Sequence, residues 1–191
     1  MKRLFLIGGT MGVGKTTVGQ ILKKRLPDCV FLDGDWCWEM DPFQVNDETK
    51  QMVMENICFL LKNFIRCSAY KNIVFCWVMH EQTIIDEILG KLPLEDCQVF
   101  PISLLCAPAE LERRLQKDVA DGIRREDVIG RSTERLPLYR ALHTLPVDVT
   151  ELTPEETAAQ IERLCGAEES GRAGCRQRRP EPSAAATERE R

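Results

Sequence analysis

The sequence of 191 residues has no long hydrophobic run, no pair of cysteines at CxxC spacing and only two histidines. A membrane-spanning helix needs about 20 consecutive apolar residues, so we expect none here. The apolar run at 4–7 is also too short for the core of a secretory signal peptide, and we therefore expect a cytoplasmic location. The formal net charge of −4 offers no basic footprint for nucleic acid. We expect neither nucleic-acid nor membrane partners.

The nine cysteines are odd in number, and most of them lie in apolar runs such as 74–77 and 104–106. This placement is typical of buried free thiols that pack as small hydrophobic side chains. His80 and His143 are the only histidines, which argues against a zinc site. We predict no disulfide framework and no zinc.

Composition is that of a globular protein, with 43% hydrophobic and 29% charged residues. The length fits one domain with a sizeable core. Residues 166–191 differ, because they are rich in Arg and Glu and hold almost no large apolar side chains. Such a segment cannot bury enough surface to offset its ordering entropy. We predict a domain at 1–165 and a disordered tail at 166–191.

Strand and helix patterns alternate along the domain. Short apolar runs predict strands, and apolar residues at helical spacing predict helices. The predicted strands are 4–7, 29–32, 73–78, 99–105 and 146–149. The predicted helices are 16–26, 47–67, 81–89, 108–119, 125–142 with an interruption at Pro137, and 154–165, which opens on a capping box. This alternation indicates an α/β fold with a five-stranded parallel sheet and helices on both faces.

The strongest motif is Gly9-Thr10-Met11-Gly12-Val13-Gly14-Lys15-Thr16, which fits G-x-x-x-x-G-K-[ST] at every position and is followed by Thr17. It lies after a hydrophobic strand and opens a helix, where backbone N–H groups and the helix dipole favour phosphate. The ammonium of Lys15 would reach the β- and γ-phosphates, and the hydroxyl of Thr16 would hold Mg²⁺. We predict a nucleotide-binding site at this loop.

Two carboxylates, Asp33 and Asp35, follow the second predicted strand and flank Gly34. Ligands of open α/β sheets bind at the carboxyl ends of the strands, and strand alternation would point both side chains into one cleft. Trp36 and Trp38 come next, and the sequence leaves open whether they line a pocket or pack in the core.

Arginines are frequent between 113 and 135. Arg124, Arg131 and Arg135 are spaced to share one helical face. Planar guanidinium groups suit the negative oxygens of a transferring phosphoryl group, which suggests a lid at about 120–138. The acidic residues nearby leave a solvated, paired surface as the alternative.

Residues 2–165 resemble the small P-loop kinases, a group that includes nucleoside and nucleotide kinases, shikimate kinase-like enzymes and antibiotic phosphotransferases. The resemblance implies a three-layer P-loop NTPase fold with ATP and Mg²⁺ as cofactors. It implies that Asp33 binds Mg²⁺ through water, and that Asp35 accepts the proton of an acceptor hydroxyl or orients that hydroxyl. It also implies that Arg114 lies against adenine and that Arg124 and Arg131 close on the phosphates. The stretch 147–153 resembles the adenine loop of these kinases.

The third predicted strand departs from the pattern of these kinases. It ends without the aspartate of a Walker B motif and without the glycine cluster of shikimate kinases, which argues against shikimate as the acceptor. His80 and Glu81 follow this strand and are candidates to touch an acceptor.

These observations lead to one expected function and two alternatives. We expect transfer of the γ-phosphoryl group of ATP to a small hydroxyl acceptor by a monomer or homodimer. One alternative is a nucleoside or nucleotide kinase, for which Arg66 and the lid arginines would bind an acceptor phosphate. The other is a nucleotide-dependent switch without a small acceptor. The sequence does not identify the acceptor or separate ATP from GTP.

Overall fold

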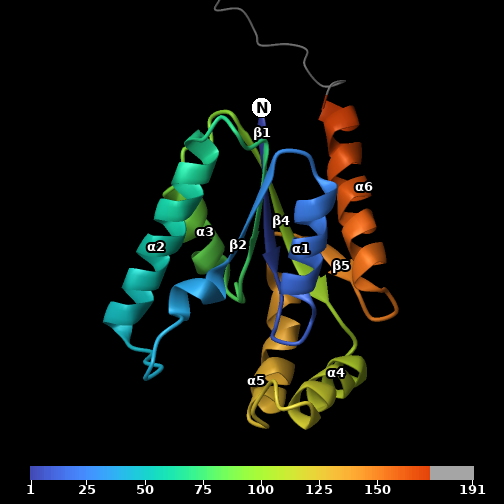
Figure 1. Ribbon diagram of the computed structural model, residues 1–191. Helices are drawn as coiled ribbons and strands as arrows, with labels where there is room; N and C mark the ends of the chain where they lie inside the picture. The colour runs from blue at the N-terminus through green and yellow to red at the C-terminus, as the bar shows by residue number, and fades with distance from the viewer. Residues whose placement is uncertain (173–191) are drawn as a thin grey trace, which may run out of the picture.

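The computed structural model describes residues 1–172, in which five parallel strands form one sheet. The strand order is β2-β3-β1-β4-β5. The strands are β1 (Lys2–Gly8), β2 (Cys29–Asp33), β3 (Asn72–Cys76), β4 (Cys97–Leu105) and β5 (Leu145–Asp148). The first strand is therefore the middle one, and its carboxyl end meets those of its neighbours at the lower edge in Figure 1. The predicted five-stranded parallel sheet is confirmed.

Helices cover both faces of the sheet (Figure 1). The α-helices are α1 (Lys15–Arg25), α2 (Asp47–Arg66), α3 (Gln82–Gly90), α4 (Pro108–Ala120), α5 (Val128–Arg135) and α6 (Pro154–Arg172). Two short 3-10 helices, η1 (Gly34–Trp38) and η2 (Leu136–Ala141), follow β2 and α5. Among the described residues, no helix is long and apolar enough to cross a membrane.

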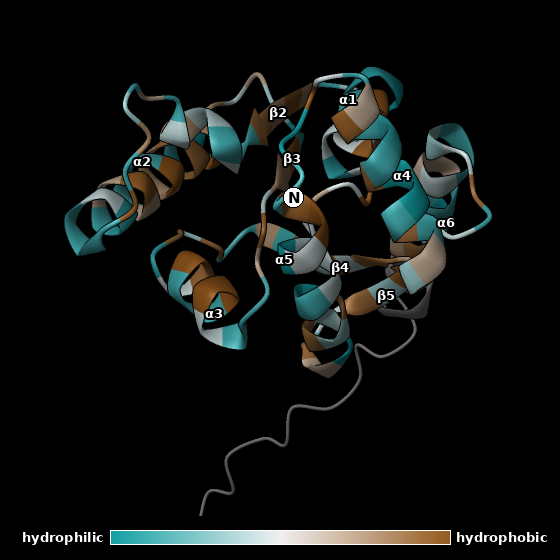
Figure 2. Ribbon diagram, turned by 90° about the horizontal axis from the view of Figure 1, so that it is seen from below, coloured by the Kyte–Doolittle hydropathy of each residue, from teal (hydrophilic) through white to brown (hydrophobic). Residues whose placement is uncertain are grey.

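The sheet separates two hydrophobic cores because successive strand residues point to opposite faces. Phe5 and Ile7 of β1 pack with α1, α4 and α6 in one core, while Leu4 and Leu6 pack with α2 and α3 in the other. Figure 2 shows the brown apolar strands enclosed between helices whose outer faces are teal. Burial on both faces explains why these strands appear in the sequence as continuous apolar runs.

Local signals fix where several helices begin. The side chain of Asn46 accepts a hydrogen bond from the N–H of Thr49 at the start of α2, at 2.9 Å. At the start of α6, the carboxylate of Glu156 accepts from the N–H of Thr153 at 2.9 Å, and the N–H of Glu156 donates back to the Thr153 hydroxyl at 3.2 Å. The predicted capping box at α6 is confirmed.

Two predicted boundaries are wrong. The helix expected at 125–142 begins only at Val128. The interruption expected at Pro137 is confirmed, since the chain changes to 3-10 geometry at Leu136 because Pro137 has no N–H to continue the α-helical ladder. The last helix runs to Arg172, beyond the end expected at residue 165. Of the predicted tail, 166–172 is therefore helical, and 173–191 lies outside the described residues.

Candidate active site

The loop at 9–14 joins β1 to α1, and its three glycines, Gly9, Gly12 and Gly14, all have positive φ. Gly12 has φ +81° and Gly14 has φ +103°, a conformation that residues with a side chain rarely adopt. Space is also short at Gly12, because a Cβ there would lie 2.5 Å from Cδ2 of Leu115 in α4. The glycines of the motif thus let the loop curl tightly and let α4 approach it.

Lys15 and Thr10 hold this loop from the inside. The Nζ of Lys15 donates to the backbone carbonyl of Thr10 at 3.0 Å, and the Lys15 residue is only 8% exposed. The hydroxyl of Thr10 donates to the carbonyl of Ser132 in α5 at 3.0 Å, which ties the loop to the segment beyond α4. Burial lowers the pKa of Lys15, and the carboxylates of Asp35 and Asp33 partly oppose this effect.

Thr16 and Asp33 meet at the start of α1. The Thr16 hydroxyl donates to Oδ2 of Asp33 at 2.6 Å, and Asp33 is buried at the end of β2. Cys76 is the last residue of β3 and lies beside Asp33 in the sheet. It stands near the end of the strand that lacks the aspartate of a Walker B motif. Burial raises the pKa of the Cys76 thiol, so this third group stays neutral. A hydroxyl and a carboxylate oxygen beside a phosphate loop form a donor set that fits Mg²⁺.

Asp35 reaches the site by a route other than strand alternation. The strand ends at Asp33, and Asp35 lies in η1, where its N–H donates to Oδ1 of Asp33 at 3.1 Å. Trp77 packs against Gly34, where an added Cβ would lie 2.5 Å from the indole, and it lies close enough to Asp35 to lower the pKa of that carboxyl slightly. Asp35 as a whole residue is exposed, but its carboxyl group is partly buried. This burial, and to a smaller extent the charge of Asp33, raises the pKa of Asp35, while the charges of Lys15 and Arg124 lower it.

A cavity of about 890 Å³ lies between the phosphate loop and the segments around α4 and the start of α6, which are to the right of the loop in Figure 1. Its walls come from four parts of the chain: the loop with the start of α1, η1, the α4 segment, and the β5–α6 connection. They are 11–18, Asp35, six residues between 110 and 124, 149–154 and Thr157. Of the predicted nucleotide-binding residues, those from Met11 to Thr17 line this cavity, whereas Gly9 and Thr10 are buried beneath it.

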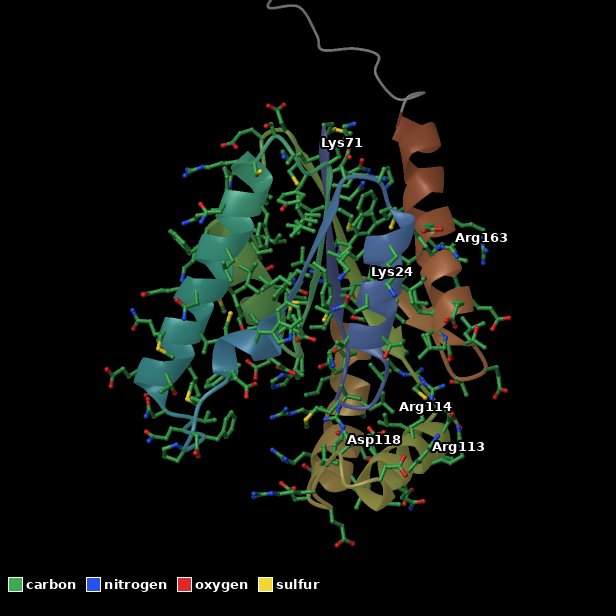
Figure 3. All side chains as sticks on the ribbon, in the orientation of Figure 1. Lys24, Lys71, Arg113, Arg114, Asp118 and Arg163 are labelled. Carbon is green, nitrogen blue, oxygen red and sulfur yellow. The ribbon has the colours of Figure 1, made fainter. Side chains whose placement is uncertain are left out.

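Arg114 lies on the wall formed by α4. Its guanidinium donates to the carbonyl of Val149 at 2.9 Å and to the Glu110 carboxylate at 2.8 Å. Arg113 shares that carboxylate, and the two arginines lower the pKa of Glu110 to about 2. Figure 3 shows Arg113 and Arg114 together on α4, with Asp118 on the same helix nearer α5. Arg114 thus links α4 to the stretch 147–153, which resembles the adenine loop of the small P-loop kinases.

The lid arginines are not equivalent. Arg124 lines the cavity and donates its Nε–H to Oδ2 of Asp118 at 3.0 Å. Arg131 is exposed, pairs with Asp127 at 2.8 Å and is absent from the cavity wall. The predicted shared helical face is wrong, because α5 begins at Val128 and Arg124 precedes it in a turn.

Other predicted residues lie away from the cavity. Trp36 is 54% exposed and meets the Phe31 ring edge to face, while Trp38 packs on Phe43. The Nε2 of His80 lies 3.4 Å from the carboxylate of Glu81, and neither residue lines the cavity. Within the part of the chain that the structure describes, no three His, Cys, Asp or Glu side chains gather as a metal site.

Two residues at the site had no signal in the sequence. Trp77 is one of seven apolar residues at 73–79, and only the end of β3 places its indole against Gly34 and near Asp35. Asp118 resembles any solvated helix residue, and only the turn after α4 brings Arg124 back to it.

A central strand, a glycine loop with a buried lysine, and a helix that starts on a Thr–Asp pair define a P-loop nucleotide-binding fold. The chain belongs to the P-loop family described as "AAA domain", whose model matches residues 6–134. No curated protein shows significant sequence similarity to the chain.

Several solved structures share the fold, and small-molecule kinases are among them. The tunicamycin resistance protein of Deinococcus radiodurans is 20% identical with a TM-score of 0.67, over 87% of this chain and 96% of that one. A gluconokinase from Sinorhizobium meliloti is 17% identical with a TM-score of 0.61, over 87% and 95%. Shikimate kinase from Acinetobacter baumannii, solved with shikimate, is 23% identical with a TM-score of 0.60, over 88% and 95%. The chain therefore has the small-molecule kinase fold.

Proposed function

We propose that the protein transfers the γ-phosphoryl group of ATP to a hydroxyl group of a small acceptor, with Mg²⁺ as cofactor. The observation that carries this proposal is the position of Asp35. Its carboxyl shares one cavity with Lys15 and Thr16 of the phosphate loop, and the charges of Lys15 and Asp35 are close enough to shift each other's pKa. A base beside the phosphate loop is the arrangement that a hydroxyl acceptor requires.

The residues divide the chemistry between them. The acceptor oxygen forms a bond to the γ-phosphorus as the bond from that phosphorus to the β,γ-bridging oxygen breaks, and ADP leaves. Asp35 accepts the proton of the acceptor hydroxyl, and its raised pKa makes it a better base than an ordinary aspartate. Lys15 and Arg124 place positive charge where negative charge develops on the phosphoryl oxygens.

Thr16 and Asp33 would hold the metal ion, because a hydroxyl and a buried carboxylate oxygen already face each other at 2.6 Å. Bound Mg²⁺ supplies charge neutralisation for the β- and γ-phosphates. Arg114 and the backbone of 149–153 would border the base of the nucleotide, since they form the far wall of the same cavity.

The location of Arg66 favours a hydroxyl acceptor over a nucleotide acceptor. A phosphate acceptor needs arginines of its own near the reacting group, and Arg66 was the candidate outside the lid. Arg66 ends α2 and lines a different cavity, together with Met1 and Lys2, at the opposite edge of the sheet. Arg131 forms an ion pair with Asp127 and does not line the cavity. These positions leave Arg124 as the lid arginine best placed to act.

The test is an ADP-release screen with Mg²⁺ and ATP over sugars, sugar acids, nucleosides, nucleotides and hydroxylated antibiotics. We expect a hydroxyl compound to stimulate ADP release in the wild type. Asp35→Asn should abolish transfer to it while nucleotide binding stays intact. Glu48→Gln is the matched control, because it removes an exposed carboxylate in the first turn of α2 and leaves the cavity unchanged.

Two results would contradict the proposal. Stimulation by nucleoside monophosphates alone, with activity retained in the Asp35→Asn variant, would indicate a nucleotide kinase. Nucleotide binding without stimulation by any small molecule, together with binding of a protein partner in only one nucleotide state, would indicate a switch.

A further inference from the structure

We propose that Asp118 is a positioning residue that holds Arg124 toward the phosphate loop, an inference that rests on the proposed nucleotide site. Both side chains line the 890 Å³ cavity, and the Nε–H of Arg124 donates to Oδ2 of Asp118 at 3.0 Å. Neither the phosphate motif nor the resemblance to kinases assigns a role to Asp118.

The backbone after α4 is folded around Asp118. The helix ends at Ala120, and Gly122 then adopts φ +71°, in the left-handed region that reverses the chain. The N–H groups of Ile123 and Arg124 both donate to the carbonyl of Asp118, at 2.9 and 3.3 Å. One residue therefore accepts hydrogen bonds from the returning chain with its backbone and from the Arg124 guanidinium with its side chain.

This geometry directs the positive charge of Arg124 to the reacting groups. Arg124 lowers the pKa of both Lys15 and Asp35, which places its charge within reach of the γ-phosphate position that those groups border. The bond to Asp118 uses only Nε. Among the side chains that the structure describes, the terminal amino groups of Arg124 have no hydrogen-bond partner, so they stay available for phosphate oxygens.

Stability alone does not account for the pair. The two side chains are 35% and 31% exposed, and ion pairs at that exposure add little to the free energy of folding. The comparison with Arg131 and Asp127 is informative, because that pair has the same chemistry but lies outside the cavity. What distinguishes Asp118 is that its partner faces the phosphate loop. A pre-oriented arginine loses less side-chain entropy when it binds a phosphoryl group.

The inference is tested by calorimetric binding of AMP-PNP and ADP, each with Mg²⁺, to the full chain. Because Arg124 would contact the γ-phosphate, Arg124→Ala should weaken AMP-PNP about tenfold and ADP less than about twofold. Asp118→Asn should weaken AMP-PNP about threefold or more, again with ADP nearly unchanged. Asp118→Glu should restore most of the loss, and Asp118→Asn should add nothing in the Arg124→Ala background.

Glu112→Gln is the matched control, since it removes one charge from an exposed position of α4 outside the cavity wall. Its affinities should equal those of the wild type. The inference is overturned if Asp118→Asn weakens both nucleotides equally, adds fully to Arg124→Ala, changes nothing, or tightens AMP-PNP, which would mean that Asp118 competes for the arginine.

The same measurement separates this inference from the proposed function. Wild-type protein that binds neither nucleotide would remove the basis of both. If nucleotides bind but no acceptor stimulates ADP release, the proposed transfer fails, while the binding cycle on residues 118 and 124 still decides the role of Asp118.

Discussion

Lys15 is buried where an ammonium group destabilises the fold. Loss of water lowers its pKa below the ordinary value of 10.5, and Arg124 adds a smaller effect in the same direction. A lysine with a lowered pKa in the folded state costs folding free energy at every pH where it is protonated. Such a cost is typical of functional sites, because the charge is retained for a ligand.

Lys15→Met should therefore separate activity from stability. Methionine keeps a similar unbranched, apolar stem, so packing is largely preserved. We expect phosphoryl transfer to fall by about 10³-fold or more, since one preorganised charge at the transition state is lost. The free energy of unfolding at neutral pH should stay equal or increase.

The pH dependence of that stability difference has a defined sign. At pH values below the lowered folded pKa, the lysine is charged in both the folded and unfolded wild type, so the full cost of burial is present. As pH rises through the lowered folded pKa toward 10.5, the cost shrinks, and above 10.5 it vanishes. Urea unfolding of wild type and Lys15→Met across this range measures the trend. Lys24→Ala, an exposed change on the same helix, controls for lost charge. A variant markedly less stable at neutral pH would contradict the argument.

Residues of the site differ in how far the sequence predicts them. Lys15 and Thr16 were predictable because a contiguous motif fixes them in a single turn between strand and helix. Trp77 and Asp118 were not, because their roles depend on where β3 ends and on how the chain turns after α4. Arg131 has the right residue type and spacing, yet a local carboxylate engages it outside the cavity.

Among the elements, α1 and α5 each contain a glycine within the helix, and the surroundings of the two glycines are opposite. An added Cβ at Gly19 would lie 2.4 Å from the Phe31 ring, so α1 packs directly on β2 there. At Gly130 in α5 an added Cβ meets nothing within 4 Å, and φ is not positive. Close packing explains the first glycine, whereas the second only weakens its helix.

Alanine substitution should separate these two cases. Gly130→Ala should raise the free energy of unfolding by about 0.5–1 kcal/mol, the usual gain in helix propensity. Gly19→Ala should lower it by about 1–3 kcal/mol through overpacking against Phe31. Urea denaturation with unchanged m-values measures both changes. A stabilising Gly19→Ala, or a strongly destabilising Gly130→Ala, would contradict the packing described here.

The elements themselves were largely predictable from the sequence, since each strand is a short apolar run and most helices carry apolar residues at helical spacing. The segment between α4 and η2 was predicted only in part, because the interruption at Pro137 was expected but the helix begins at Val128 and not at 125. Its arginines have helical spacing, but Gly122 and Pro137 divide the chain into a turn, a short helix and a 3-10 segment. Backbone geometry at these two residues outweighs side-chain periodicity.

At the scale of the whole molecule, nucleotide binding should stabilise the fold, because the cavity is assembled from segments that are distant in sequence. MgATP at about 100 times its Kd should raise the free energy of unfolding by about 2.7 kcal/mol. Chelating the metal should remove much of that gain, as should Thr16→Val, which deletes the hydroxyl that meets Asp33. Thermal unfolding against ligand concentration measures the effect. Thr133→Val is the control, since its hydroxyl bonds only within α5, and an absent gain in the wild type would argue against nucleotide binding.

The placement of β1 in the centre of the sheet also bears on how the chain is made. Arg3 pairs with Asn72, 69 residues further on, and β4 is synthesised later still. Until β3 and β4 have both been synthesised, β1 is an apolar strand whose two edges have no hydrogen-bond partners. Non-local parallel pairing of this kind closes slowly. Refolding after dilution from denaturant should therefore compete with aggregation, so the yield of native protein should rise as the protein concentration is lowered. A chaperone present during expression should also raise that yield.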